Sequence, residues 1–221
     1  MCGRITLDNM SWAEFRDWLT LSRAPETAIP SRYNVAPTGS VPIIRPGPDG
    51  LEGAVARWWF IPGWFRGNLS EWKASTFNAR AEDLARKPAF RDAYRHGRCA
   101  VLASGYYEWQ QRDGSKHPHY IHPAGNAPAL IMAGLCSEAH LPDWQGLTCT
   151  VLTEAARGAM GAIHDRMPLM LEPDGLHLWL AGAAAENLPR LPLGALAWHE
   201  VSRAVNAVRN DDESLIEPIE G

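Results

Sequence analysis

The second residue of the chain is a cysteine, and this position gives it chemistry that an internal cysteine lacks. If Met1 is removed, Cys2 carries a free α-amine beside its thiol. Their reference pKa values, roughly 7.7–8.0 and about 8.5, leave both groups partly deprotonated near neutral pH. The amine can form an imine with an aldehyde, and the thiol can then close a five-membered ring on the same carbon. A cysteine also occurs at position 2 by chance, so the pattern alone leaves both readings open.

Glu108 and His164 are candidates for the proton transfers that such chemistry needs. Glu108 stands between Tyr107 and Trp109. A carboxylate among aromatic rings is poorly solvated, which raises its pKa and suits acid–base work. Strand alternation puts Tyr107 and Trp109 on one face and Tyr106 and Glu108 on the other, so Glu108 could equally face water. His164 lies in an expected loop, where an imidazole titrates near neutrality. The alternative is a histidine that interacts only with the dipole of a preceding helix.

Asn78 and Arg80 share one side of an expected extended segment. An asparagine amide can hold an amine by hydrogen bonding, and the guanidinium fork of an arginine binds phosphate well. Roles as turn and cap residues are the alternative. The three histidines within 117–122 are poorly spaced around a proline for metal coordination, and we expect neither a metal site nor a cofactor.

The composition is that of a single globular domain. The chain has 221 residues, of which 46% are hydrophobic, and we expect one domain over 1–221 with an acidic tail at about 210–221. There is no apolar run of membrane-spanning length and no signal pattern, so we expect a soluble, cytoplasmic and monomeric protein. The four cysteines lack CxxC spacing, which argues against a zinc site or a disulfide framework. A net charge of −4 weighs against nonspecific nucleic-acid binding.

Hydrophobic periodicity and turn signals predict many short strands and few helices. Ser11 and Glu14 form a capping-box pattern before a helix, and Asp113-Gly114 marks a hairpin turn. The expected helices cover 12–21, 82–96, 155–163 and 176–181. The expected strands cover 2–7, 41–45, 54–61, 99–103, 105–109, 118–122, 129–135, 147–153, 169–171 and 196–201. These elements predict a single mixed α+β domain with a curled, barrel-like sheet and a few flanking helices.

Six short motifs follow one another in a fixed order, from residue 1 to about 210. They are Met-Cys-Gly-Arg at 1–4, Arg-Tyr-Asn-Val-Ala-Pro at 32–37, Asn-Ala-Arg-Ala-Glu at 78–82, Gly-Tyr-Tyr-Glu-Trp at 105–109, His-Asp-Arg-Met-Pro at 164–168 and Val-Ser-Arg-Ala-Val at 201–205. Each motif alone is weak, but together they make the chain resemble the SRAP (SOS-response-associated peptidase) family. Members of that family form cross-links with abasic sites in single-stranded DNA.

The resemblance implies a role for each candidate catalytic residue. After Met1 is removed, the amine of Cys2 would form a Schiff base with the ring-opened abasic sugar, and the thiol would close a thiazolidine. Asn78 would hold the amine, Glu108 would act as general acid and base, and His164 would assist opening of the sugar. It also implies weak strand cleavage by a lyase reaction and a cysteine-type peptidase activity.

The resemblance likewise implies a set of residues for single-stranded DNA that contains abasic sites. Arginines would contact phosphates, and aromatic side chains would meet bases beside the lesion. Tyr106 and Phe65 stand where many or some family members have tryptophan, and both keep an aromatic face. The expected DNA-binding residues are Arg4, Asn34, Pro37, Trp64, Phe65, Arg80, Tyr106, Arg166, Ser202 and Arg203.

Two other functions remain open at the level of sequence. Glutamine amidotransferase domains also begin Met-Cys-Gly and use the cysteine after trimming, although Arg4 and the later motifs do not match that class. A module that binds single-stranded DNA without covalent chemistry is the second alternative. The negative net charge of the protein disfavours this second alternative, because broad binding to the phosphate backbone of DNA needs more positive charge.

Overall fold

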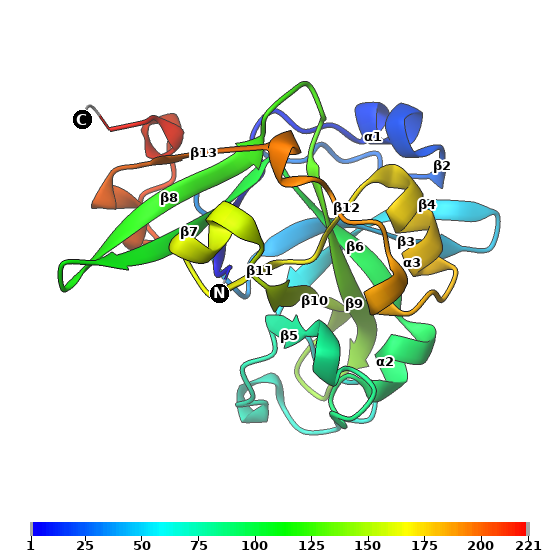
Figure 1. Ribbon diagram of the computed structural model, residues 1–221. Coiled ribbons are helices and arrows are strands. Elements are labelled where there is room, and N and C mark those ends of the chain that lie inside the picture. The colour runs from blue at the N-terminus through cyan, green and yellow to red at the C-terminus, as the bar shows by residue number, and fades with distance from the viewer. Residues whose placement is uncertain (1, 220–221) are drawn as a thin grey trace.

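The computed structural model describes residues 2–219, and its largest feature is a closed barrel (Figure 1). β10 pairs with β4 on one side and with β9 on the other, so that five strands close a ring in the order β10-β4-β3-β6-β9. Four further strands join this sheet outside the ring. The strands of this sheet are β2 (Leu21–Arg23), β3 (Ser40–Gly47), β4 (Gly50–Trp58), β5 (Asn78–Arg80), β6 (Arg98–Ala103), β9 (Leu130–His140), β10 (Gln145–Ala155), β11 (Arg166–Pro168) and β12 (Met170–Leu171).

A second sheet of four strands lies beside the barrel, in the order β1-β7-β8-β13. Its strands are β1 (Arg4–Thr6), β7 (Gly105–Arg112), β8 (Ser115–Pro123) and β13 (Leu196–Glu200). The β7–β8 hairpin projects away from the barrel (Figure 1). Asp113 and Gly114 have φ angles of 51° and 73°, both left-handed, as a type I′ turn requires. The hairpin predicted from this dipeptide is confirmed.

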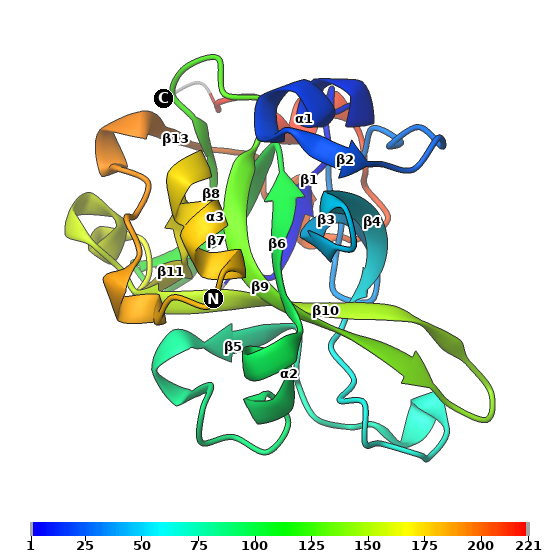
Figure 2. The same cartoon turned by 90° about the vertical axis from the view of Figure 1, so that its right-hand side faces the viewer.

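Three α-helices lie outside the barrel: α1 (Trp12–Leu19), α2 (Arg91–His96) and α3 (Pro173–Leu180). Ser11 caps α1 as predicted, because its side chain accepts a 3.2 Å hydrogen bond from the Glu14 amide. Viewed from the side, α2 and β5 lie below the long β9–β10 hairpin and α3 lies against the barrel wall (Figure 2). Within residues 2–219, no helix is long and apolar enough to span a bilayer.

Two of the expected helices differ in the structure. The helix expected over 82–96 is broken into a 3-10 turn at Ala81–Asp83 and the short α2. Pro88 lies between them, and proline lacks the N–H and the space that a helix interior needs. The helix expected over 155–163 is only a 3-10 turn at Gly158–Ala162, because β10 continues to Ala155 and Gly158 adopts a left-handed φ of 47°.

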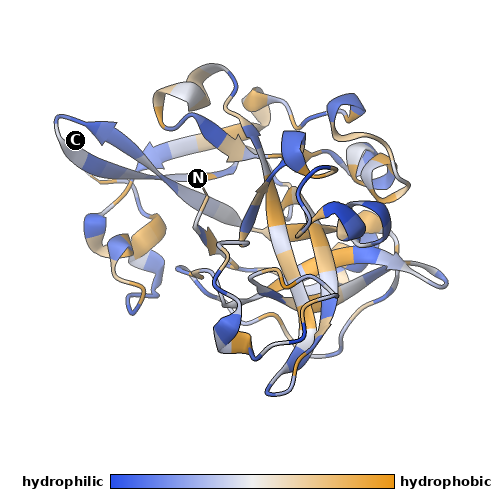
Figure 3. Cartoon of the chain, turned by 90° about the horizontal axis from the view of Figure 1, so that it is seen from below, coloured by the Kyte–Doolittle hydropathy of each residue, from blue (hydrophilic) through white to orange (hydrophobic). Residues whose placement is uncertain are grey.

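The barrel strands carry the apolar core, which appears as orange bands on the central strands (Figure 3). From Cys99 to Ala103, every side chain of β6 is fully buried. Such a run is buried on both faces and cannot show the alternation of a half-exposed strand. The predicted α+β class and the curled, barrel-like sheet are confirmed, and the described residues hold 13 strands, more than the nine or so expected.

The acidic end of the chain packs onto the fold as far as residue 219. Leu215 is buried in a small cluster with Tyr107, Tyr120, Val201 and Val205. Asp211 accepts hydrogen bonds from the backbone amides of Tyr33 and Asn34 at 2.6 and 2.9 Å. This segment therefore fixes the loop that contains the second motif.

Candidate active site around Cys2

Cys2 is fully buried immediately before β1. The side-chain amide of Asn78 donates a 2.6 Å hydrogen bond to the carbonyl oxygen of Cys2. The thiol of Cys2 lies 4.0 Å from the carbonyl of Arg4. Asn78 begins β5, which runs parallel to β10 with Asn78 opposite Val151. The closed barrel thus positions the amide against the first residues of the chain.

Glu108 lies on β7 with only 4% of its surface exposed. Alternation along β7 holds as predicted: Tyr107 packs on the other face, where its hydroxyl donates to the carbonyl of Tyr33 at 2.8 Å. Tyr106 and Glu108 are two residues apart on β7 and therefore share the face opposite to Tyr107. Burial raises the pKa of Tyr106, and its neighbours Cys2 and Glu108 raise it further. The alternative of a water-facing Glu108 therefore does not hold.

The electrostatics of the site keep the Cys2 thiol protonated at neutral pH. Burial raises the pKa of this thiol well above its usual value, and the negative charge of Glu108 raises it further. A thiol in this state is a weak nucleophile until a base removes its proton. Glu108 is the carboxylate whose negative charge acts on this thiol.

An open pocket of about 460 Å³ borders Glu108 and His164. Its other lining residues are Trp109, Gln111, Lys116 and Asn206. The ring nitrogen Nδ1 of His164 accepts a 3.0 Å hydrogen bond from the Arg166 amide and lies 2.8 Å from an oxygen of Asp165.

Three of the pocket residues were not singled out from the sequence. Gln111 and Lys116 face each other across the β7–β8 hairpin, and Asn206 accepts a 2.8 Å hydrogen bond from the indole of Trp109. The predicted hairpin turn could have identified Gln111 and Lys116, because the turn fixes which residues of the two strands lie opposite one another.

Trp64 and Phe65 form an aromatic surface at some distance along the chain from the Cys2 site. Trp64 is 50% exposed, and its ring lies 5.8 Å from that of Trp72. Phe65 lies 5.0 Å from the same ring. Trp72 is thus a third member of the cluster that the sequence analysis did not single out. Exposed rings held by neighbouring rings are suited to stacking against bases.

The two arginines near β5 differ in their partners. Arg80 ends β5 with its side chain exposed, and its guanidinium forms no ion pair within residues 2–219. The guanidinium of Arg166 binds both oxygens of Glu82 at 2.6 and 3.0 Å, and it also donates to the Thr153 carbonyl at 2.7 Å. This bond to Arg166 lowers the pKa of Glu82. Arg166 is therefore paired with a carboxylate, whereas the exposed Arg80 acts on Glu82 only through its charge.

Arg4 and Asn34 hold together distant parts of the chain. Arg4 donates to the side chain of Asn34 and to the Val205 carbonyl, each at 2.7 Å. The fully buried Asn34 donates in turn to the carbonyls of Val205, Ala207 and Asn210. In the structure described, the contacts of both residues are internal.

The other residues expected at DNA occupy varied places. Tyr106 is 2% exposed and forms part of the wall behind Cys2. Ser202 caps a 3-10 turn by accepting from the Ala204 amide at 3.2 Å, and Arg203 is exposed. Pro37 is partly buried and precedes Thr38, whose φ of 80° is strained for a β-branched residue. Strain of this kind collects at functional sites.

Comparison with known proteins identifies the family to which the chain belongs. A family model described as SOS response associated peptidase (SRAP) matches residues 1–208. Abasic site processing protein YedK of Escherichia coli is 30% identical over 99% of this chain and 100% of its own. Abasic site processing protein YoqW of Bacillus subtilis is 34% identical over 98% and 99%, and abasic site processing protein HMCES of Gallus gallus is 31% identical over 100% and 78%.

A crystal structure of a protein from Bacteroides thetaiotaomicron has the same fold. It superposes with a TM-score of 0.84 at 22% identity and covers 99% of this chain and 100% of its own. The family match spans the six motifs that the sequence analysis identified, and the curated relatives align over nearly the whole chain. The chain therefore belongs to the SOS response associated peptidase (SRAP) family.

Proposed function

We propose that this protein recognises abasic sites in single-stranded DNA and becomes covalently attached to them through Cys2 after removal of Met1. The observation that carries the proposal is the convergence of Asn78 and Glu108 on Cys2, deep in the protein and next to an open pocket. Relatives of similar length are named abasic site processing proteins, which supports DNA as the partner. An abasic sugar is also the DNA lesion that supplies an aldehyde.

The reaction begins at nitrogen. The free amine of Cys2 attacks the C1′ aldehyde of the ring-opened sugar, and the resulting carbinolamine loses one water to give an imine. Asn78 positions the amine through its side-chain amide. Glu108 takes the proton that the nitrogen loses as it bonds to the carbon and returns it to the departing hydroxyl, and His164 at the pocket assists opening of the sugar ring.

The thiol completes the reaction. Glu108, deprotonated after the first step, accepts the thiol proton, and the sulfur attacks the imine carbon while the imine electron pair returns to nitrogen, which takes up a proton. A thiazolidine results, with both Cys2 heteroatoms bonded to C1′. Because the thiol is held in its protonated form until then, the amine acts first. Reversal uses the same groups in the opposite order.

An imine that does not cyclise has another outcome. Loss of the proton at C2′ leads to β-elimination of the 3′ phosphate and cleaves the strand, so a weak lyase activity accompanies the cross-linking. A cysteine-type peptidase activity draws on the same thiol and carboxylate. The glutamine amidotransferase alternative shares only the Met-Cys-Gly start, and the family match over residues 1–208 favours the abasic-site reaction over it.

The test is a denaturing gel with Met1-processed protein and a single-stranded oligonucleotide that bears one abasic site. A slower-migrating band should form with this oligonucleotide. It should be absent with an intact oligonucleotide and with one that carries a tetrahydrofuran analogue, which binds like the lesion but has no aldehyde. Cys2→Ala should abolish the heat-stable band. A band of equal intensity with the analogue would show that the attachment does not use the aldehyde and would refute the proposal.

A further inference from the structure

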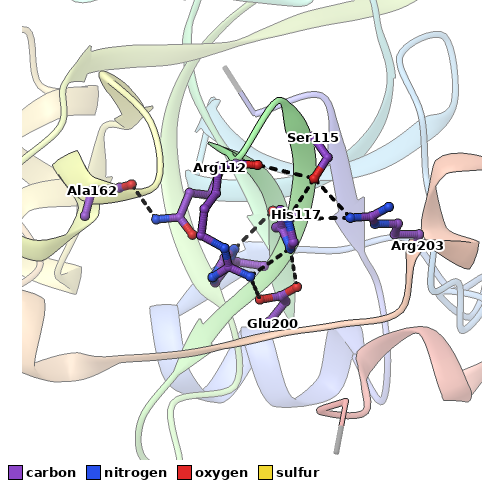
Figure 4. Close-up of polar contacts among 8 residues, drawn as sticks. Arg112, Ser115, His117, Ala162, Glu200 and Arg203 are labelled. Carbon is purple, nitrogen blue, oxygen red and sulfur yellow. Dashed lines mark hydrogen bonds and ion pairs between the residues drawn. The ribbon is translucent and has the colours of Figure 1, made fainter. Parts of the chain in front are cut away.

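A second cluster of reactive side chains lies near the tip of the β7–β8 hairpin, separate from Cys2 (Figure 4). Ser115 and His117 both belong to β8, two residues apart, and therefore project from the same face of the strand. Glu200 ends the neighbouring strand β13. Cross-strand register places Ser115 opposite Arg112 and His117 opposite Gln110 on β7. The cluster is thus on the same side of the hairpin as Glu108, about 13 Å further along the strand.

The distances within the cluster are those of a nucleophile, a base and an orienting acid. The hydroxyl oxygen of Ser115 lies 2.9 Å from Nε2 of His117. Nδ1 of the same ring lies 2.6 Å from an oxygen of Glu200. A serine and a histidine within hydrogen-bond reach, with the histidine oriented by a third group, is the arrangement that activates a hydroxyl.

The proton positions follow from the neighbours of the ring. Glu200 can only accept, so the short contact places a proton on Nδ1 and leaves the lone pair of Nε2 directed at Ser115. Arg112 can only donate; its guanidinium bonds the other oxygen of Glu200 at 3.0 Å and lies 2.9 Å from Nδ1 of His117, farther than the 2.6 Å contact of Glu200 with that nitrogen. The bond with His117 lowers the pKa of Glu200, with Arg112 contributing, which keeps this carboxylate charged.

Arg203 supplies a positive charge beside the hydroxyl. Its guanidinium lies 3.2 Å from the oxygen of Ser115 and 3.5 Å from Nε2 of His117. The hydroxyl proton has a second acceptor, the carbonyl of Arg112 at 3.2 Å, but the imidazole nitrogen is the nearer one. Arg203 is exposed, so its remaining N–H groups can stabilise an oxyanion that forms on a bound carbonyl or phosphonyl group.

We propose that Ser115, His117 and Glu200 form a serine-type acyl-transfer site that acts on small activated esters and does not use Cys2. Ser115 is the nucleophile, His117 the general base and acid, and Glu200 a positioning residue. The site lies at an exposed hairpin without a deep cleft, which restricts it to small acyl groups and to slow turnover. The inference is independent of the reaction at Cys2.

The chemistry balances with water as the only co-reactant. The Ser115 oxygen bonds to the ester carbonyl carbon while His117 takes the hydroxyl proton. The carbon–oxygen bond to the leaving alcohol then breaks, and the same proton is returned to that alcohol. Water attacks the acyl-serine by the same route, which releases the carboxylic acid and restores the hydroxyl.

A fluorophosphonate probe tests the proposal on the full-length protein, because its phosphorus bonds to an activated serine oxygen as fluoride leaves. Peptide mass spectrometry should locate the label at Ser115 and at least tenfold less at Ser214. Ser214 is the matched control: its hydroxyl bonds a carboxylate oxygen of Asp212 at 2.5 Å but has no imidazole beside it. Labelling should persist in Cys2→Ala.

Variants separate a reactive site from a structural network. Ser115→Ala should remove the label, and His117→Gln should reduce labelling at least tenfold while the thermal midpoint shows a folded protein. Glu200→Gln should reduce labelling and Glu200→Asp should restore part of it. Equal labelling of Ser115 and Ser214, or labelling that is unchanged in a folded His117→Gln protein, would overturn the proposal and leave the cluster as a purely structural link between β8 and β13.

Discussion

The side-chain amide of Asn78 donates to the Cys2 carbonyl at 2.6 Å, although 76 residues separate the two in sequence. The other end of the same amide, Oδ1, is buried and accepts no hydrogen bond within residues 2–219. An unpaired buried acceptor is costly, so this oxygen is well suited to receive an N–H of the amine that Met1 removal creates. One side chain would thus fix both the carbonyl and the amine of Cys2.

Asn78→Ala should slow cross-linking by roughly 10- to 100-fold, because the amine loses the group that orients it toward the aldehyde. Rates are measured by single-turnover gel assays with processed protein. Asn126→Ala, at an exposed asparagine, is the control and should match the parent protein. An unchanged rate in Asn78→Ala would remove this residue from the reaction.

Glu108→Gln should change two reactivities in opposite directions. Cross-linking should slow by about 100-fold or more, because the proton donor and acceptor is lost. Alkylation of the Cys2 thiol by iodoacetamide should become faster at fixed pH, since Glu108 raises the pKa of that thiol. Both are followed by peptide mass spectrometry, with exposed Glu186→Gln as control. If the two rates fall together, the variant has disturbed the fold and the acid–base role lacks support.

Arg80→Ala should weaken binding of single-stranded DNA and reduce the slope of log affinity against log salt by about one. Arg166→Ala should change that slope less, because Glu82 already neutralises its charge. Arg16→Ala on α1 serves as the control for an exposed arginine. Titrations with a tetrahydrofuran-containing oligonucleotide measure affinity without cross-linking. Identical slopes for the parent protein and Arg80→Ala would exclude a phosphate contact.

Asn34→Ala should lower the free energy of unfolding by about 1–3 kcal/mol, since Arg4 loses one of its hydrogen bonds and the carbonyls of Ala207 and Asn210 lose their side-chain donor. The loss should appear as a lower midpoint in chemical denaturation, with Asn126→Ala unchanged. A midpoint equal to that of the parent protein would show that the hydrogen bonds of the Asn34 side chain add nothing to stability.

The Glu82–Arg166 pair should contribute to stability only above acidic pH. The pKa of Glu82 is lowered in the folded protein. The pair therefore stabilises the fold fully above the usual glutamate pKa of 4.5, and this stabilisation disappears as the pH falls through the lowered pKa of Glu82. Because Glu82 is half exposed, the effect of Glu82→Gln should be below about 1 kcal/mol at pH 7. Chemical denaturation of the parent protein and of Glu82→Gln at pH 7 and at pH 3 measures this contribution. A difference in stability between the two proteins that persists at pH 3 would show that it does not come from the charge of Glu82.

Short-range sequence signals predicted much of the secondary structure. The Ser11 cap and the Asp113-Gly114 turn are short-range features, and both elements formed as predicted. The helix expected over 82–96 does not form as one element, because Pro88 interrupts it. Closure of the barrel depends on β10 pairing with β4 and β9, and such long-range pairing leaves no mark in a single sequence.

In the candidate site too, local sequence signals predict some features, and others depend on long-range packing. Alternation along β7 predicted that Tyr106 and Glu108 share a face, but not that this face is buried against Cys2. Arg4 was expected at phosphate by resemblance, and its bonds to Asn34 and Val205 come from parts of the chain that meet only in the folded protein. Residue type predicts what a side chain can do, whereas its partners depend on tertiary packing.

The central claim is that both the amine and the thiol of Cys2 bond to the lesion. The most direct measurement is peptide mass spectrometry of the purified cross-link after treatment with iodoacetamide under denaturing conditions. The account predicts an adduct at Cys2 equal to the sum of the two partners less one water, with no alkylation of Cys2, because the sulfur is closed into the ring. An adduct of that mass whose Cys2 thiol is still alkylated, or an adduct at another residue, would contradict it.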